Sequence, residues 1–138
     1  MLLFSHELLH VFLYCFAVYT VSRTKRGLVT KKLFFVGLAA TLLIDTDHFL
    51  DFFIAGGSDF FSGSYFAESG RIIVLLHSWE FVAILGGVSL LRKNRILLFV
   101  ALGFFIHILM DAAYYRFPLG SYLLVNRILH NFAISVFN

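Results

Sequence analysis

The chain has 138 residues, of which 60% are hydrophobic and only 14% are charged, and its mean hydropathy is +0.89. A typical soluble domain has about 25% charged residues, so this chain has too little polar surface to cover a sphere in water. The net charge of +3 does not indicate nucleic-acid binding, because most Lys and Arg residues flank apolar runs. The composition excludes an ordinary soluble domain and predicts an all-α integral membrane protein.

Four apolar runs are long enough for transmembrane helices, since about 20 residues are needed to cross the hydrocarbon core. The first helix is predicted over residues 5–22 and the second over residues 33–54. The third is predicted over residues 71–91 and the fourth over residues 96–115. We therefore expect residues 1–138 to form one membrane-embedded bundle of four helices.

Two further segments lie outside these helices. Gly56–Gly70 is rich in Gly, Ser and Phe, which indicates a loop or a short interfacial re-entrant piece. The tail, residues 119–138, is apolar but contains polar residues such as Asn126, Arg127 and His130. It is predicted to form an interfacial helix or a fifth, poorer span.

Basic residues are concentrated in the connections that follow the first and third predicted helices. Eight of the eleven Lys and Arg residues lie there, namely Arg23, Lys25, Arg26, Lys31, Lys32, Arg92, Lys93 and Arg95. Loops rich in Lys and Arg stay on the cytoplasmic side of a membrane. We therefore expect the chain to lie in the cytoplasmic (inner) membrane, with the opposite ends of the helices on the extracytoplasmic side.

Ionisable residues gather at those opposite ends in all four predicted helices. They are His6, Glu7, His10, Asp45, Asp47, His48, Asp51, His77, Glu80, His107 and Asp111. A charged group at the bilayer centre costs roughly 2.5–3.5 kcal/mol. Because chance would scatter such groups along the helices, the cluster predicts a functional site near the outer leaflet.

The spacing of these residues indicates shared helix faces. His6 and His10 are one turn apart, as are His107 and Asp111, so each pair lies on one face and can bind the same metal ion. In the second helix, Asp45 is followed by His48 and Asp51 at intervals of three residues. That face is predicted to carry all three side chains, with the intervening Asp47 turned aside.

A mixture of imidazoles and carboxylates is typical of a divalent metal site, with zinc favoured and manganese or iron as alternatives. One or two ions are expected, and the single cysteine, Cys15, excludes a multi-cysteine zinc site. The predicted metal ligands are His6, His10, Asp45, His48, His77, His107 and Asp111. The residues predicted to orient the ligands or to act as general base are Asp47, Asp51 and Glu80, with Glu7 as the alternative base.

The run Asp45-Thr46-Asp47-His48, followed by His77 and by His107 to Asp111, resembles the YdjM-like small polytopic membrane-bound metal-dependent hydrolases. The paired histidines of the first helix and the His77-Ser78-Trp79 run are most similar to a sister family of unknown function. These families resemble zinc phospholipase C and P1-type nucleases, in which His-x-x-x-Asp helix pairs bind zinc. The resemblance implies a metal-dependent phosphoester hydrolase.

The leading hypothesis is a membrane-embedded hydrolase that acts on a phosphoester or lipid-borne substrate at the outer leaflet. The expected partners are the lipid bilayer and that substrate; homo-oligomerisation stays open and no nucleic acid is expected. One alternative is a metal or proton transporter that uses the same cluster. Another is an intramembrane zinc protease, because His6-Glu7-x-x-His10 matches a metalloprotease pattern.

Overall fold

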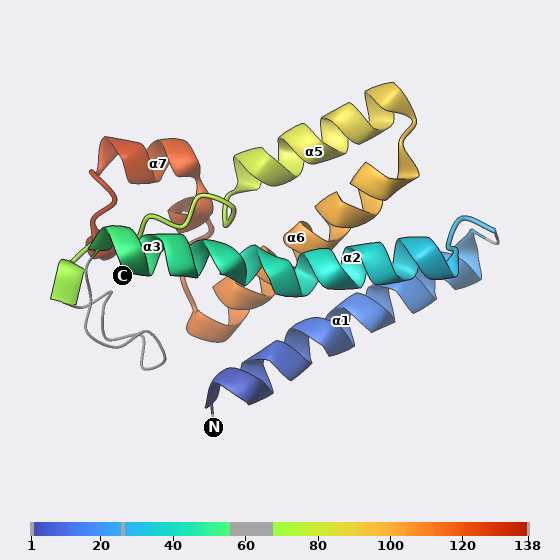
Figure 1. Cartoon of the computed structure of the whole chain (residues 1–138), viewed down its shortest axis with the longest axis horizontal. Helices are drawn as coiled ribbons and strands as arrows, with labels where there is room; N and C mark the ends of the chain where they lie inside the picture. Colours follow the sequence, from blue (N-terminus) through green and yellow to red (C-terminus); the bar gives the residue numbers. More distant parts are fainter. Residues whose placement is uncertain (1, 26, 56–67, 138) are drawn as a thin grey trace.

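The computed structural model describes residues 2–25, 27–55 and 68–137, and these residues form an arrangement of α-helices (Figure 1). Their one isolated β-bridge is antiparallel and pairs Arg71 with Ala133. The predicted loop or re-entrant piece at Gly56–Gly70 lies mostly outside the described residues. The prediction of an all-α chain is confirmed for the described part.

The first half of the chain forms a helical hairpin. Helix α1 (Leu2–Thr24) is followed by α2 (Lys31–Leu43). A short 3₁₀ turn, η1 (Ile44–Thr46), then joins α2 to α3 (Asp47–Ala55), so that the helical segment continues to the end of the predicted second helix. The structure therefore places a tightened turn inside what the hydrophobic pattern predicts as one helix.

The second half begins with α5 (Trp79–Arg92) and α6 (Arg95–Tyr115), which form an antiparallel pair (Figure 1). The tail then forms η2 (Leu119–Tyr122), α7 (Leu124–Leu129) and η3 (Ile134–Phe137). Helix α6 packs against α1, α2 and α5. It is therefore the central helix of the fold.

Local capping explains where several helices begin. Thr30 precedes α2 and accepts a hydrogen bond from Leu33 N, and Asn94 precedes α6 and accepts from Ile96 N and Leu97 N. Short polar side chains at this position satisfy N–H groups that have no partner inside the helix. Lys93 ends α5 in the left-handed region, at φ 50°. This makes the tight basic turn between α5 and α6.

Two helical segments are long and apolar enough to cross a membrane, Lys31–Ile54 and Arg95–Tyr115. Both coincide with spans predicted from the sequence. The other two predicted spans are not among the candidates: α1 covers the first predicted span, and α5, which covers most of the third, has 14 residues and reaches about 21 Å, short of a hydrocarbon core of about 30 Å. Two segments among the described residues thus have the length and composition of a membrane span, and the four-span bundle stays a prediction.

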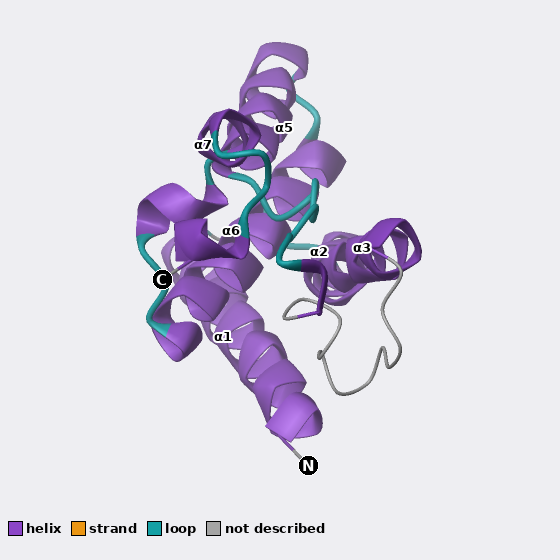
Figure 2. Ribbon diagram, turned by 90° about the vertical axis from the view of Figure 1, so that its left-hand side faces the viewer, coloured by secondary structure: helices purple, strands orange, loops and turns teal. Residues whose placement is uncertain are grey.

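Residues Arg71–Ser78, which we call the strap, are not helical where the sequence predicts the start of a helix. Figures 1 and 2 show the strap running between α3 and α7. Two of its backbone N–H groups find carboxylate partners in α3: Ile73 N donates to Asp51 Oδ1 at 2.8 Å and Leu76 N donates to Asp47 Oδ2 at 2.7 Å. Because these carboxylates replace helical hydrogen bonds, the segment stays outside a helix until Ser78 caps α5.

Helices α2 and α6 meet at two glycines. A Cβ atom at Gly103 would lie 2.5 Å from the carbonyl oxygen of Gly37, and one at Gly37 would lie 2.8 Å from the carbonyl oxygen of Phe99. The two backbones are therefore in direct contact, which only glycine allows here. Small residues at such crossings are typical of helices that associate in membranes.

The basic connections lie toward one end of the molecule. In Figure 1 the α1–α2 connection and the α5–α6 turn are both toward the right, whereas the N-terminus, α3 and α7 are toward the left. This arrangement agrees with the expectation that both basic loops share one side. The side of the membrane that these loops face stays a prediction.

Candidate metal centre

The structure brings the seven predicted ligands together from four separate segments. Helix α1 supplies two histidines, η1 with α3 supplies an aspartate and a histidine, the strap supplies one histidine, and α6 supplies a histidine and an aspartate. All seven belong to groups of side chains whose ligand atoms lie within 4.8 Å of one another: His6, His10, Asp45, His48, His77, His107 and Asp111. Glu7 and Asp47 lie in the same groups.

Four of these side chains form a compact core. Asp45 Oδ1 lies 3.2 Å from His77 Nε2 and 3.2 Å from His107 Nε2. The two Nε2 atoms lie 3.3 Å from each other. Asp111 Oδ2 lies 3.3 Å from His107 Nε2 and 3.6 Å from His77 Nε2. Two carboxylate oxygens and two ring nitrogens from three segments therefore face one another.

His107 is held by a backbone carbonyl. Its Nδ1 lies 2.7 Å from the carbonyl oxygen of Thr41. A carbonyl oxygen only accepts, so Nδ1 carries the proton, and in the neutral ring the lone pair of Nε2 points into the core. Thr41 and His107 each lie one turn after a glycine of the α2–α6 crossing, so the glycine contact brings this donor and acceptor within reach.

His77 has a carboxylate behind its ring. Its Nδ1 lies 3.0 Å from Asp47 Oδ1, while its Nε2 faces the core. An anion at this position attracts a proton to Nδ1 and leaves Nε2 free to bind a cation. Asp47 is predicted to turn aside, but it is buried at 6% exposure, because the 3₁₀ turn at η1 rotates successive side chains further than an α-helix does.

The two buried carboxylates of the core need a compensating positive charge. The carboxylates of Asp45 and Asp111 face imidazole nitrogens in a region where His77 and His107 are almost fully buried. Buried charges are stable only when they are paired or bind a metal ion. Either protons on the imidazoles or a cation between the four atoms can supply the positive charge. The donor set therefore fits a divalent cation, and the same groups form ion pairs when the histidines are protonated.

Helix α1 adds two buried histidines beside the core. His6 Nε2 lies 2.9 Å and His10 Nε2 lies 3.1 Å from the same atom, Asp111 Oδ1. The ring of His10 also lies against that of His107, with ring centroids 3.8 Å apart. The predicted pairing of His6 with His10 on one face is therefore present, and both face α6.

The accessible edge of the cluster is formed by three side chains. Asp45, Glu7 and His48 have side-chain exposures of 31%, 31% and 27%. Glu7 Oε2 lies 3.6 Å from His10 Nδ1, and His48 Nε2 lies 3.6 Å from Asp45 Oδ1. A small molecule that reaches the core from outside the chain would meet these groups first.

Two carboxylates predicted as orienting groups or bases have backbone partners. Asp51 Oδ1 accepts from Ile73 N in the strap. The two oxygens of Glu80 accept from Leu124 N at 2.9 Å and Val125 N at 3.1 Å, where α7 begins. These contacts support the strap and the tail, and a role as general base stays a prediction for Asp51 and Glu80.

Arg127 is a buried residue whose role the sequence does not reveal. Its side chain is 0% exposed and donates to the carbonyl oxygens of Val74 and His77. Burial lowers the pKa of the Arg127 guanidinium, and the nearby Asp47 and Glu80 carboxylates oppose that shift. The only signal in the sequence is an arginine inside an apolar tail, which gives no indication of its partners.

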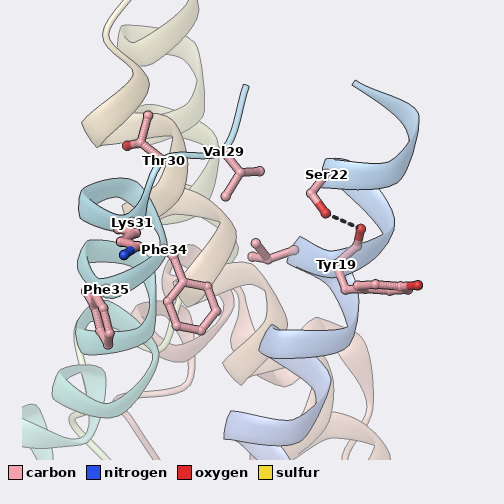
Figure 3. A pocket seen from close by; sticks show the side chains of 8 residues that line it. Tyr19, Ser22, Val29, Thr30, Lys31, Phe34 and Phe35 are labelled. Carbon is pink, nitrogen blue, oxygen red and sulfur yellow. Dashed lines mark hydrogen bonds between the residues drawn. The ribbon is translucent and has the colours of Figure 1, made fainter. Parts of the chain in front are cut away.

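A groove of about 600 Å³ lies at the other end of α1 and α2 (Figure 3). It is lined by Val18, Tyr19, Ser22, Val29, Thr30, Lys31, Phe34 and Phe35. None of the candidate ligands lines it, and Ser22 lies about 18 Å along α1 from His10. The groove and the histidine cluster are therefore separate features.

Comparisons with protein-family models, with curated proteins and with solved structures found no match. The resemblance to the YdjM-like hydrolases therefore stays a prediction. Fold and site together define a helical protein with two candidate membrane spans and a buried His/Asp/Glu cluster that can hold a metal ion.

Proposed function

We propose that this chain is a membrane-embedded, metal-dependent hydrolase. The observation that carries the proposal is the spacing of the core atoms. A tetrahedral zinc ion with bonds of about 2.0–2.1 Å places its ligand atoms about 3.3 Å apart. The distances among Asp45 Oδ1, His77 Nε2 and His107 Nε2 are 3.2, 3.2 and 3.3 Å, and Asp111 Oδ2 lies 3.3 Å from His107 Nε2 and 3.6 Å from His77 Nε2. Zinc is the favoured ion, with manganese or iron as alternatives.

Membrane insertion is supported by the surface as well as by the two long apolar segments. Large apolar side chains are widely exposed, including Phe12 at 66%, Phe53 at 77% and Leu91 at 85%. Extended apolar surface of this kind marks contact with lipid or with other proteins. The two basic connections favour the inner membrane, with the histidine and carboxylate cluster on the extracytoplasmic side.

The chemistry of such a centre is hydrolysis. A divalent cation held there would supply a nucleophile at neutral pH by lowering the pKa of a bound water, provided that it takes a fifth ligand or exchanges one of the four protein ligands for water. Glu7 is our candidate general base, because it lies at the accessible edge and faces His10. Asp47 Oδ1 lies 3.0 Å from His77 Nδ1 and Thr41 O accepts from His107 Nδ1, contacts that favour Nε2 of both rings facing the core.

The proposed substrate is a lipid-borne phosphoester at the outer leaflet. Its support is the resemblance of the ligand motifs to phosphoester hydrolases, together with the accessible edge formed by Glu7, Asp45 and His48. A substrate held in the bilayer can approach that edge without leaving the membrane.

The test is the metal content of detergent-purified protein, measured by elemental mass spectrometry, beside His77→Ala and His107→Ala. His130→Ala is the matched control, because His130 is an exposed tail histidine whose Nδ1 is bonded to Asn126 O. We expect stoichiometric metal in the wild type and the control, and its loss from both core variants.

Activity is then assayed on phosphoesters and phospholipids. Folded wild type without stoichiometric metal would refute the proposal. Metal binding without hydrolysis, together with metal uptake into liposomes that depends on His107, would favour the transporter instead. Hydrolysis of peptides that depends on Glu7 would favour the protease.

A further inference from the structure

The groove between α1 and α2 is polar at one end and apolar further in (Figure 3). Its polar lining lies at the α1–α2 connection and consists of Ser22, Thr30 and Lys31. About one helical turn further from the connection, the lining is apolar and aromatic and consists of Val18, Tyr19, Phe34 and Phe35. A ligand that matches this groove therefore has a polar head and an apolar body.

The apolar part of the groove is open to the surroundings. Tyr19 is 61% exposed and Phe35 is 62% exposed. The groove has a volume of about 600 Å³, within the range of about 300–1,000 Å³ that is usual for pockets that bind small molecules. Aromatic side chains close to a basic loop are typical of the depth at which lipid head groups meet acyl chains. The groove therefore has the size and the surface to hold part of a lipid.

The stretch of chain that forms the groove carries only positive charge among its Lys, Arg, Asp and Glu residues. No Asp or Glu occurs between Glu7 and Asp45, whereas five basic residues lie there: Arg23, Lys25, Arg26, Lys31 and Lys32. Basic clusters beside a membrane helix attract anionic lipids, and basic pockets between such helices bind their head groups. A second copy of this chain would bring the same positive charge to the groove. Charge complementarity therefore favours an anionic lipid as the occupant.

The geometry points to a binding site for an anionic phospholipid of the cytoplasmic leaflet. One acyl chain lies along Tyr19, Phe34 and Phe35, and the phosphate lies at the ammonium group of Lys31. A lysine side chain suits this position, because its apolar stem packs along the groove while its charge stays at the head groups. The direction of the groove, with its polar end at the basic connection, is the direction of a phospholipid in that leaflet.

The hydroxyl groups at the polar end differ in what they offer. Thr30 Oγ1 accepts a hydrogen bond from Leu33 N, and a hydroxyl can donate its own proton to a phosphate oxygen at the same time. Ser22 Oγ instead donates to the carbonyl oxygen of Tyr19 at 2.7 Å (Figure 3). Thr30 and Lys31 are therefore the groups that hold the phosphate.

This lipid is not the proposed substrate. None of the candidate metal ligands lines the groove, and Ser22 lies about 18 Å along α1 from His10. The proposed substrate belongs to the outer leaflet, whereas the basic connection lies at the opposite end of the helices. The inference rests on membrane insertion, and it does not depend on metal binding or hydrolysis. Because the lipid binds the folded hairpin, it stabilises the fold by mass action.

The test is a titration of phosphatidylglycerol into the full-length protein in an uncharged detergent, with bound lipid counted by native mass spectrometry. We expect tighter binding of phosphatidylglycerol than of phosphatidylcholine. Lys31→Gln is expected to weaken phosphatidylglycerol binding about five-fold. Arg92→Gln is its matched control, because it removes the same charge from an exposed residue of the other basic connection that does not line the groove.

The apolar part is tested in the same way with Phe35→Ala, which is expected to weaken binding of both lipids. Its matched control is Phe53→Ala, since Phe53 is 77% exposed and lies in α3, away from the groove. Thermal unfolding of each purified variant establishes that it is folded.

Equal binding by Lys31→Gln and Arg92→Gln, or by Phe35→Ala and Phe53→Ala, would overturn the site. Displacement of the lipid by inorganic phosphate would show a simple anion site and would overturn the lipid assignment. A lipid-free dimer that Phe35→Ala dissociates would assign the groove to a second copy of the chain. Metal content is measured in the same samples: lipid binding without metal would refute the proposed hydrolase alone, and metal without lipid binding would refute this site alone.

Discussion

His107 and Thr41 join the two candidate spans through one hydrogen bond, of 2.7 Å, from a ring nitrogen to a backbone carbonyl. The bond forms one turn beyond the place where the backbones of Gly37 and Gly103 touch. Helix packing and ligand orientation are therefore parts of the same contact. A change in the crossing of α2 and α6 is therefore expected to alter the geometry of the candidate metal centre.

Gly103→Ala tests this coupling. The added Cβ would lie 2.5 Å from the carbonyl oxygen of Gly37, so the helices must separate. Overpacking of this kind costs about 1–3 kcal/mol, and loss of the group that orients a metal-binding histidine weakens metal affinity roughly 10- to 100-fold. We expect both effects, measured by thermal unfolding and by metal titration.

Gly86→Ala is the matched control, because a Cβ at Gly86 meets nothing within 4 Å. Gly86 lies in α5, where alanine is expected to be neutral or to stabilise the fold by about 0.4–1 kcal/mol. If Gly103→Ala and Gly86→Ala behaved alike, helix contact would not control the centre.

Arg127→Lys is expected to destabilise the folded position of the strap. Arg127 donates to two carbonyls through separate nitrogens of one planar group, which a single ammonium does not reproduce. A buried carbonyl left without its partner costs about 1–3 kcal/mol. One of these carbonyls belongs to His77, so we expect weaker metal binding as well as faster proteolysis near the strap.

The exposed Arg116 provides the control, because Arg116→Lys keeps the charge at a position without burial. Limited proteolysis and metal titration of the two variants are compared with those of the wild type. Equal resistance of Arg127→Lys and Arg116→Lys would show that the guanidinium contacts do not stabilise the strap.

Sequence reasoning could predict the convergence of the ligands because its physical basis is simple. Charged groups are costly in lipid, so polar residues at the same ends of several apolar runs, such as His10 and Asp111, indicate a common site. The prediction that both basic connections lie on one side of the membrane is equally simple, because loops rich in Lys and Arg stay in the cytoplasm. Both inferences need only the order of residues along helices.

The strap could not be predicted in this way. Residues 71–78 are as apolar as a helix requires, and their non-helical conformation depends on Asp47, Asp51 and Arg127, which lie far away in the sequence. The inward position of Asp47 depends on a 3₁₀ turn that hydrophobic periodicity does not reveal. Partners that are distant along the chain decided the structure at these positions.

Removal of metal is expected to destabilise the protein. A ligand that binds only the folded state adds about 2.7 kcal/mol when its concentration is 100 times the dissociation constant. Without the cation, Asp45 and Asp111 depend on protonated histidines for charge compensation. We expect a chelator to lower the melting temperature in detergent, and zinc to restore it. Magnesium should not, because it prefers oxygen ligands in an octahedral site. An unchanged melting temperature would contradict a metal centre in the fold.

Orientation in the membrane can be tested with single cysteines after Cys15→Ala removes the only native thiol. Leu119→Cys probes the end that carries the cluster, where Leu119 is 59% exposed, and Thr24→Cys probes the basic connection. Because basic loops stay in the cytoplasm, we expect a membrane-impermeant maleimide to label Leu119→Cys in intact cells and Thr24→Cys only after permeabilisation. The opposite pattern would place the metal centre on the cytoplasmic side, and recovery of both variants in the soluble fraction would refute membrane insertion.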